Sequence, residues 1–125
     1  MKDFKKLSVW EKAHQLTLDI YHETRKFPRE ELYGITSQMR RASASVAANI
    51  AEGCGRGRDG EFHYFLNNAA GSAVELEYFL LLAEDLALVP QCGHENLQSK
   101  VLEIQRMLSG LLRTISKTRQ SMRPA

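Results

Sequence analysis

Apolar residues recur in steps of four and three along several stretches of this chain. The clearest series lies in residues 60–88 and comprises Phe62, Leu66, Ala69, Ala73, Leu76, Leu80, Ala83 and Ala87. Such steps place side chains on one face of an α-helix, with the spacing of a helix-bundle seam. We find no convincing alternation of apolar and polar residues, the pattern that predicts a half-buried strand. The spacing therefore predicts an all-α fold.

Four helices are predicted in this way, over residues 8–26, 31–53, 60–88 and 95–119. Short connections between amphipathic helices are typical of an antiparallel up-down-up-down four-helix bundle. Because the 125 residues contain no repeat, linker or low-complexity segment, we expect residues 1–125 to form a single four-helix-bundle domain.

Local signals suggest how three of these helices begin or end. Ser8 and Glu11 have the spacing of a capping box at the start of the first helix. Gly53 suits the left-handed cap that often ends a helix, here the second. Asp59 is a favourable N-cap residue for the third helix.

Composition and cysteine content exclude several classes of protein. Hydrophobic residues make up 43% and charged residues 26%, while the net charge of +2 is too balanced to indicate a nucleic-acid binder by itself. Cys54 and Cys92 stand apart, so no C-x-x-C pattern supports a zinc or redox site. No apolar run approaches the roughly 20 residues of a membrane span. We expect a cytoplasmic protein with reduced thiols and no membrane partner.

The loop "GRGRDG", Gly55 to Gly60, matches G-x-G-x-x-G. In a dinucleotide site this motif follows a strand, which turns sharply into a helix that receives the pyrophosphate. Here the glycines follow a predicted helix, so we favour a flexible corner between two helices. Small residues on both sides, "ASASVAAN" and "AAGSA", then predict close packing of the second and third helices. A grip on a polyanion by the loop arginines stays open.

Candidate catalytic groups do not form recognisable sets. His14 and His22 lie two helical turns apart, too far to share a metal ion, and the other two histidines stand alone. Glu75 and Glu77 are two residues apart, so they do not face each other on a helix. If Glu75 is partly buried, it needs a partner such as an arginine. We expect no catalytic residues, no metal and no cofactor, and hence a non-enzymatic protein.

Basic residues off the apolar seams are the candidates for binding. They are Arg40, Arg41, Arg56, Arg58, Arg106, Arg113 and Lys117. One interpretation is that they only keep helix faces solvated. The other is that they contact nucleic-acid phosphates, because the planar guanidinium fork donates two hydrogen bonds to one phosphate.

The third predicted helix is apolar on more than one side. The segment "YFLLLA", Tyr78 to Ala83, offers more apolar surface than one seam can cover. A second subunit would cover the remainder most simply. We therefore predict a homo-oligomer with an interface at Tyr78, Phe79, Leu81 and Leu82.

Two blocks resemble a known family. These are "Q-x-RRA…NIAEG", Gln38 to Gly53, and "A-x-G-S-A-x-E-L", Ala69 to Leu76. The chain resembles the bacterial four-helix-bundle proteins encoded in intervening sequences of 23S rRNA genes, and the likeness weakens after about Pro90. The resemblance implies a ring-like homopentamer, and kinship with the accessory protein of diversity-generating retroelements, which is thought to bind nucleic acid and a reverse transcriptase. It brings no shared catalytic residues.

Two hypotheses about function follow. The first is a homo-oligomeric bundle that binds nucleic acid, preferably RNA, through the basic residues. The alternative is a protein-interaction scaffold that docks a partner such as a reverse transcriptase, with no direct role in nucleic-acid binding.

Overall fold

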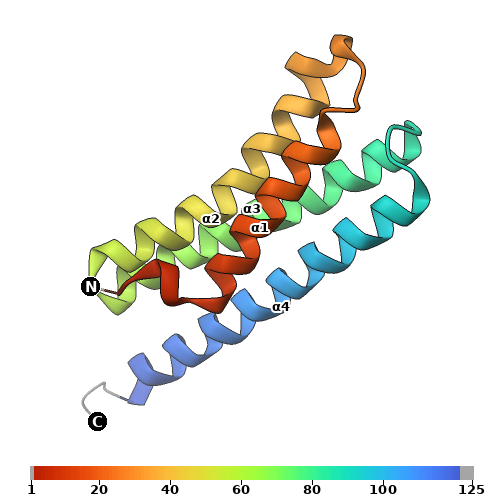
Figure 1. Ribbon diagram of the computed structural model, residues 1–125. Helices are drawn as coiled ribbons and strands as arrows, with labels where there is room; N and C mark the ends of the chain where they lie inside the picture. Colours follow the sequence, from red (N-terminus) through yellow and green to blue (C-terminus); the bar gives the residue numbers. More distant parts are fainter. Residues whose placement is uncertain (1, 122–125) are drawn as a thin grey trace.

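The protein is a bundle of four α-helices. The computed structural model describes residues 2–121, with side chains described as far as Thr118. Its helices are α1 (Ser8–Thr24), α2 (Ser37–Arg56), α3 (Asp59–Asp85) and α4 (Gln91–Ser121). Successive helices run in opposite directions, up-down-up-down (Figure 1). Contacts join α1 to α2, α2 to α3, α3 to α4, and α4 back to α1, as the apolar spacing predicts.

The predicted seams form the core. In α3, the seam residues from Phe62 to Ala83 are all buried, and Leu66, Leu76 and Leu80 have no exposed surface. Leu16 of α1, Ile50 of α2 and Leu108 of α4 meet them from the other helices. Within the described residues, no helix combines the length and the apolar character needed to cross a membrane.

Two predicted helix caps are wrong, although α1 begins at Ser8 as predicted. The Ser8–Glu11 capping box does not form: Leu7 occupies the N-cap position and makes no side-chain cap hydrogen bond. Helix α2 continues past Gly53 and ends at Arg56, and Gly57 takes the left-handed conformation with φ 78°. Gly53 is buried against α3, where an added Cβ would lie 3.0 Å from both Phe62 Cδ1 and Phe65 Cβ.

The ends of α3 also differ from the prediction. Asp59 is the first helical residue and makes no cap hydrogen bond, since Arg58 is the N-cap. At the other end α3 stops at Asp85, and Ala87 adopts a left-handed φ of 58°. The Ala87 amide donates to the carbonyl of Glu84, and the Leu88 amide donates to the carbonyl of Ala83. These two bonds form a Schellman motif, which satisfies the last carbonyls of the helix.

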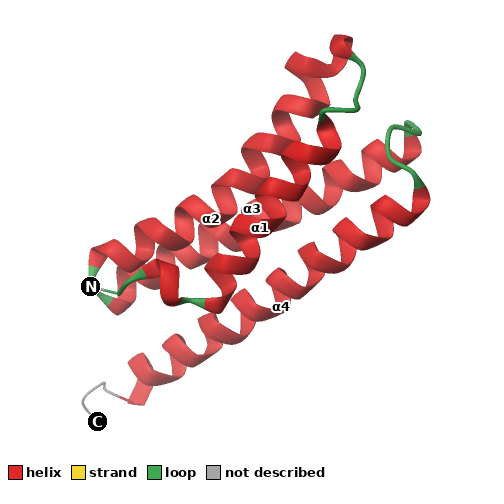
Figure 2. Cartoon of the chain, in the orientation of Figure 1, coloured by secondary structure: helices red, strands yellow, loops and turns green. Residues whose placement is uncertain are grey.

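Short turns complete the chain, and most of the described backbone is helical (Figure 2). The 3-10 turn η1 (Phe4–Lys6) packs against α1 and α2. Between α1 and α2, the 3-10 turn η2 (Arg29–Glu31) leads into one π-helical turn, η3 (Leu32–Thr36). Gly34 breaks the helical geometry there with φ −110° and ψ −118°, so the predicted helix start at residue 31 moves to Ser37. Helix α4 begins at Gln91, earlier than the predicted residue 95, and Gly93 lies within it.

The small residues of α2 and α3 meet as their sequence predicts. The hydroxyls of Ser45 and Ser72 lie 2.8 Å apart across the two helices. Asn49 donates to the Ser45 carbonyl at 2.8 Å and to its hydroxyl at 3.0 Å. The amide nitrogen of Asn49 therefore has two acceptors, both on Ser45, and the contact between Ser45 and Ser72 joins the two helices.

Candidate nucleic-acid interface

The seven predicted basic residues do not form one surface. Arg40 lies near the start of α2, while Arg56 and Arg58 lie at its far end. At 1.5 Å of rise per residue, Arg40 and Arg56 are about 24 Å apart along the helix axis. Arg106 lies within α4, and Arg113 and Lys117 lie closer to its end.

Internal partners occupy Arg40 and Arg41. Arg40 donates through Nε to Thr24 Oγ1 at 2.9 Å, and its guanidinium lies 4.8 Å from the centre of the Tyr21 ring. Arg41 pairs with Glu75 at 2.6 Å between Nη2 and Oε1, and it also donates to Gln38. The expected arginine partner of Glu75 is thus confirmed, and it connects α2 to α3.

The remaining five residues differ in their freedom to contact a ligand. Arg56 pairs with Glu52, one turn earlier on α2, and lies over the ring of Phe65. For the other four, no ion pair with an acid occurs within residues 2–118; these are Arg58, Arg106, Arg113 and Lys117. Their guanidinium and ammonium groups remain available to phosphate oxygens.

One end of the bundle collects basic side chains from three parts of the chain. The Lys2 amide donates to the Cys54 carbonyl at 3.0 Å, and Lys2 Nζ lies 4.1 Å from the centre of the Phe62 ring. The chain's start is thus attached to the corner between α2 and α3. Gln105 of α4 hydrogen-bonds to Glu77 of α3, and because the two helices run antiparallel, the later turns of α4 lie at the same end of the bundle as this corner.

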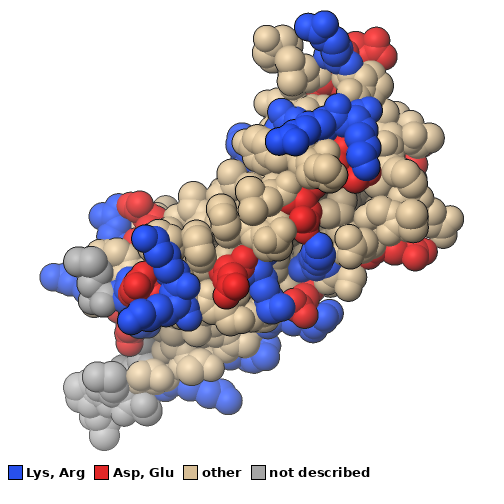
Figure 3. Space-filling model, in the orientation of Figure 1, with Lys and Arg blue, Asp and Glu red and all other residues tan. Residues whose placement is uncertain are grey.

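We call this surface the basic end, made of Lys2, Lys5, Lys6, Arg56, Arg58, Arg113 and Lys117. Basic side chains outnumber acidic ones here, and two of the acids are engaged: Asp3 caps η1, and Glu52 pairs with Arg56. Figure 3 shows basic side chains at the lower left, beside the grey residues, and a second group at the upper end. Lys2, Lys5 and Lys6 are not among the residues predicted from the sequence, although the opening letters "MKDFKK" contain them.

The outer face of α3 is apolar, as predicted, but its members differ in part. Tyr78 is 56% exposed and Leu81 49% exposed, whereas Phe79 and Leu82 are partly buried against the core. Tyr64 and Val74 add to the exposed set, at 61% and 57%. We call Tyr64, Val74, Tyr78 and Leu81 the outer stripe. Val74, Tyr78 and Leu81 follow steps of four and three on the face opposite the buried seam, and that spacing is the signal that could have revealed Val74. Tyr64 lies on the same face ten residues before Val74, about 15 Å along the axis, with exposed Asn67 and Gly71 between them.

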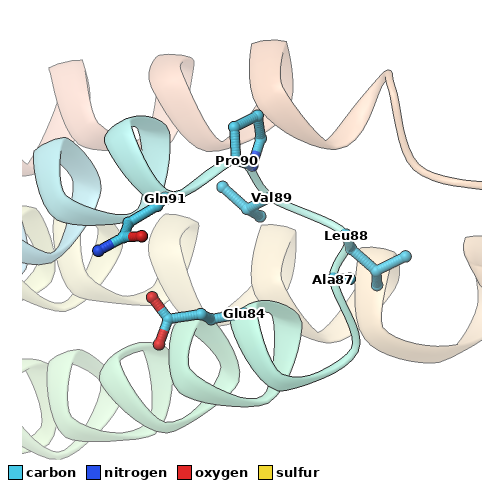
Figure 4. Close-up of a pocket in the computed structure, with 6 residues that line it drawn as sticks. All are labelled: Glu84, Ala87, Leu88, Val89, Pro90 and Gln91. Carbon is cyan, nitrogen blue, oxygen red and sulfur yellow. The ribbon is translucent and has the colours of Figure 1, made fainter.

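The pocket between α3 and α4 shows no catalytic arrangement. It is an open hollow lined by Glu84, Ala87, Leu88, Val89, Pro90 and Gln91, with Glu84 its one charged group (Figure 4). Behind it, His94 is 5% exposed and its Nε2 lies 3.3 Å from Glu84 Oε2. Within the described part of the chain, no three His, Cys, Asp or Glu residues gather in a way that would hold a metal ion.

The two cysteines lie in different environments. Cys54 is buried beside Lys2 and Phe62, and burial raises the pKa of its thiol, whereas Cys92 is exposed. Since the thiolate is the reactive form, we expect a thiol reagent at pH 8 to label Cys92 rapidly and Cys54 at least about tenfold more slowly. If the reagent is an aromatic disulfide that releases thionitrobenzoate on reaction with a thiol, the absorbance of the released thionitrobenzoate would measure both rates. The variant Cys92→Ser should retain only the slow phase, and a fast reaction in that variant would contradict the burial of Cys54.

Comparison with known proteins fits this architecture. The sequence profile of the 23S rRNA-intervening sequence protein family matches residues 5–110. The chain belongs to this family. A similar solved structure is the crystal structure of a protein with unknown function from the S23 ribosomal protein family of Bacteroides thetaiotaomicron VPI-5482. It is 23% identical, has a TM-score of 0.75, and aligns over 83% of this chain and 97% of its own.

That similarity supports the four-helix fold of this 23S rRNA-intervening sequence family member. A comparison with curated proteins gives no match. The predicted resemblance is therefore confirmed at the level of family and fold.

Proposed function

We propose that this member of the 23S rRNA-intervening sequence family is a non-enzymatic homo-oligomer that binds RNA through phosphate contacts at its basic end. The observation that carries the proposal is the gathering of three chain segments there, with Arg58, Arg113 and Lys117 unpaired with any described acid. Arginine and lysine contacts to phosphate need no particular base sequence. The family name refers to an intervening sequence of 23S rRNA, which makes structured RNA the first ligand to test.

The contact set in this proposal has seven residues, as the set predicted from the sequence has, but three of them differ. Arg40 lies near the opposite end of the bundle, Arg41 pairs with Glu75, and Arg106 lies away from the basic end. Lys2, Lys5 and Lys6 replace them, because η1 packs at the same end as the corner between α2 and α3.

The outer stripe supports self-association. Four large apolar side chains that are each about half exposed or more form one face of α3, opposite its buried seam. Exposed apolar side chains that gather on one helix face, as Val74, Tyr78 and Leu81 do, are typical of a protein interface. A homo-oligomer would repeat the basic end in every subunit, and the repeats would increase avidity for a long RNA. Five subunits in a ring is what the family resemblance implies.

Charge reversal at the basic end tests RNA binding. We expect Arg113→Glu with Lys117→Glu to weaken binding to structured RNA by about 10- to 100-fold near 0.1 M salt, because two phosphate contacts become repulsive. The slope of log affinity against log salt should fall by about 2. Fluorescence anisotropy of labelled RNA across a salt series would measure both quantities.

The matched control carries the same change in net charge elsewhere. Lys12→Glu with Lys26→Glu removes the ion pairs with Glu103 and Glu23; both lysine side chains are about half exposed or more, so the cost to stability should be small. This control should bind RNA within a few-fold of the parent protein. Equal losses in both variants would reject the basic end as the binding surface, and so would an absence of binding by the parent at low salt.

The outer stripe also favours the second candidate function, a scaffold that docks a polymerase-like protein such as a reverse transcriptase. In that case the stripe would contact the partner, and the basic residues would serve solubility. Nuclease-treated captures from cells should then recover one protein in stoichiometric amount with the parent, and none with Tyr78→Asp. RNA binding that is independent of any protein favours the first function.

A further inference from the structure

A pocket of about 300 Å³ lies between the end of α1 and the start of α2. Its lining residues are Thr24, Arg25, Phe27, Pro28, Arg29, Leu32, Thr36 and Arg40. Three of them are arginines and none is an acid. The pocket is at the end of the bundle opposite the basic end, because α2 begins here and finishes there.

Arg40 is held in place by the residues around it. Thr24 Oγ1 donates to the Ile20 carbonyl at 2.7 Å and accepts from Arg40 Nε at 2.9 Å. The ring of Tyr21 supports the face of the guanidinium. With Nε engaged and one face covered, the guanidinium has a fixed orientation, so it loses little conformational freedom when it binds an anion.

Thr36 carries a hydroxyl with no partner. The residue is 2% exposed, and its Oγ1 is buried without a hydrogen bond in the described structure. Buried hydroxyl groups are nearly always hydrogen-bonded, so such an orphan calls for an explanation. Thr36 lines the pocket and directly precedes α2, whose positive end favours a negative group. A bound anion would accept the missing hydrogen bond.

The charges inside the pocket are unbalanced in favour of an anion. Three acids lie near the pocket without lining it: Glu23 pairs with Lys26, Glu31 Oε2 would lie 3.1 Å from a Cβ added at Gly34, and Glu30 is exposed on the turn η2. Arg25 and Arg29 make no ion pair with a described acid. Three arginines therefore line one pocket together with Thr36, and no acid lines it.

We propose that this pocket binds a phosphate group, as inorganic phosphate or as the terminal phosphate of a nucleotide or oligonucleotide. A phosphate dianion offers three oxygens and nearly two charges, which suits three guanidinium forks and a hydroxyl better than a singly charged carboxylate does. The apolar side chains of Phe27 and Leu32 form the remainder of the wall. The site is separate from the RNA contacts proposed at the basic end.

Calorimetry with defined probes at constant ionic strength tests the proposal. The probes are sodium phosphate, sodium acetate, adenosine monophosphate, adenosine, and one short oligonucleotide with and without a 5′-phosphate. We expect phosphate to bind and acetate to bind at least about tenfold more weakly. Equal affinity for phosphate and adenosine monophosphate would identify the phosphate group alone as the ligand. Tighter binding that requires the 5′-phosphate of the oligonucleotide would identify a strand end.

Three variants locate the site. Arg25→Gln with Arg29→Gln changes two exposed side chains, so folding should persist, and we expect phosphate affinity to fall by at least about tenfold. Thr36→Val keeps the shape of the side chain but removes the hydroxyl, and should weaken binding several-fold. Arg58→Gln with Arg113→Gln removes the same charge at the basic end and should leave phosphate binding unchanged while it weakens RNA binding.

Three results would overturn the proposal. They are no phosphate binding beyond that of chloride, equal affinity for acetate and phosphate, and equal losses in the two double-arginine variants. Because inorganic phosphate is the probe for this pocket and structured RNA is the probe for the basic end, failure at one site remains distinguishable from failure at the other.

Discussion

Gly53→Val is expected to lower the free energy of unfolding by about 2–3 kcal/mol, because the new side chain has no space between α2 and α3. Even a Cβ atom at Gly53 would lie 3.0 Å from both Phe62 Cδ1 and Phe65 Cβ, and valine adds two further carbons. The Phe62 ring could turn away, but Phe65 Cβ is fixed to the backbone of α3, so the helices must separate. The midpoint of thermal unfolding should fall by roughly 10 °C, as circular dichroism at 222 nm would record.

Gly55→Val is the matched control. It makes the same chemical change two residues later on α2, where an added Cβ has no neighbour within 4 Å. Its stability should remain within about 0.5 kcal/mol of the parent, as is usual for an exposed helical position. Similar denaturant midpoints for the two variants would contradict the close approach of α2 and α3 at Gly53.

Tyr78→Asp with Leu81→Asp is expected to disrupt self-association. Both side chains are about half exposed in the single chain, so the bundle should still fold. Two carboxylates placed in an apolar interface would lose their hydration without gaining partners. We expect the dissociation constant to rise by at least about 100-fold, equivalent to about 2.7 kcal/mol. Sedimentation velocity over a range of concentrations would show the protein change from an oligomer to a monomer.

Leu18→Asp provides the comparison for the outer stripe. Leu18 is 49% exposed, like Leu81, but it lies on α1. This variant should associate as the parent does, and circular dichroism should show equal helix content in all three proteins. A parent protein that sediments as a monomer at 0.1 mM would remove the outer stripe as an interface between copies, since no assembly would exist to disrupt.

The helices and the core were predictable because one factor, the spacing of apolar residues along the chain, decides which side chains are buried. Leu66, Leu76 and Leu80 belong to the series with four-three spacing, which places them on one face of α3, and all three are buried in the core. Helix ends were less predictable because one residue type serves several purposes. Gly53 has the local character of a helix cap, yet the approach of α3 is what requires glycine there. The left-handed residue that ends α3 is an alanine, which carries no such signal.

The candidate sites depend on contacts between distant segments, which periodicity does not describe. Lys2 reaches the corner between α2 and α3 through a backbone hydrogen bond to Cys54, and no side-chain pattern predicts that bond. The pocket between α1 and α2, which Arg25, Arg29 and Arg40 line, depends on the π-helical turn that ends at Thr36, an irregular segment without a repeat. Arg40 and Arg41 are adjacent in sequence, but one lines this pocket while the other pairs with Glu75.

The attachment of Lys2 to Cys54 has a practical consequence for anyone who purifies this protein. An affinity tag joined ahead of Lys2 would begin close to the basic end. A polyhistidine sequence there would add its own charges and bulk to the surface that binding assays are meant to probe. Cleavage of the tag before each titration would expose the native basic end to the ligand.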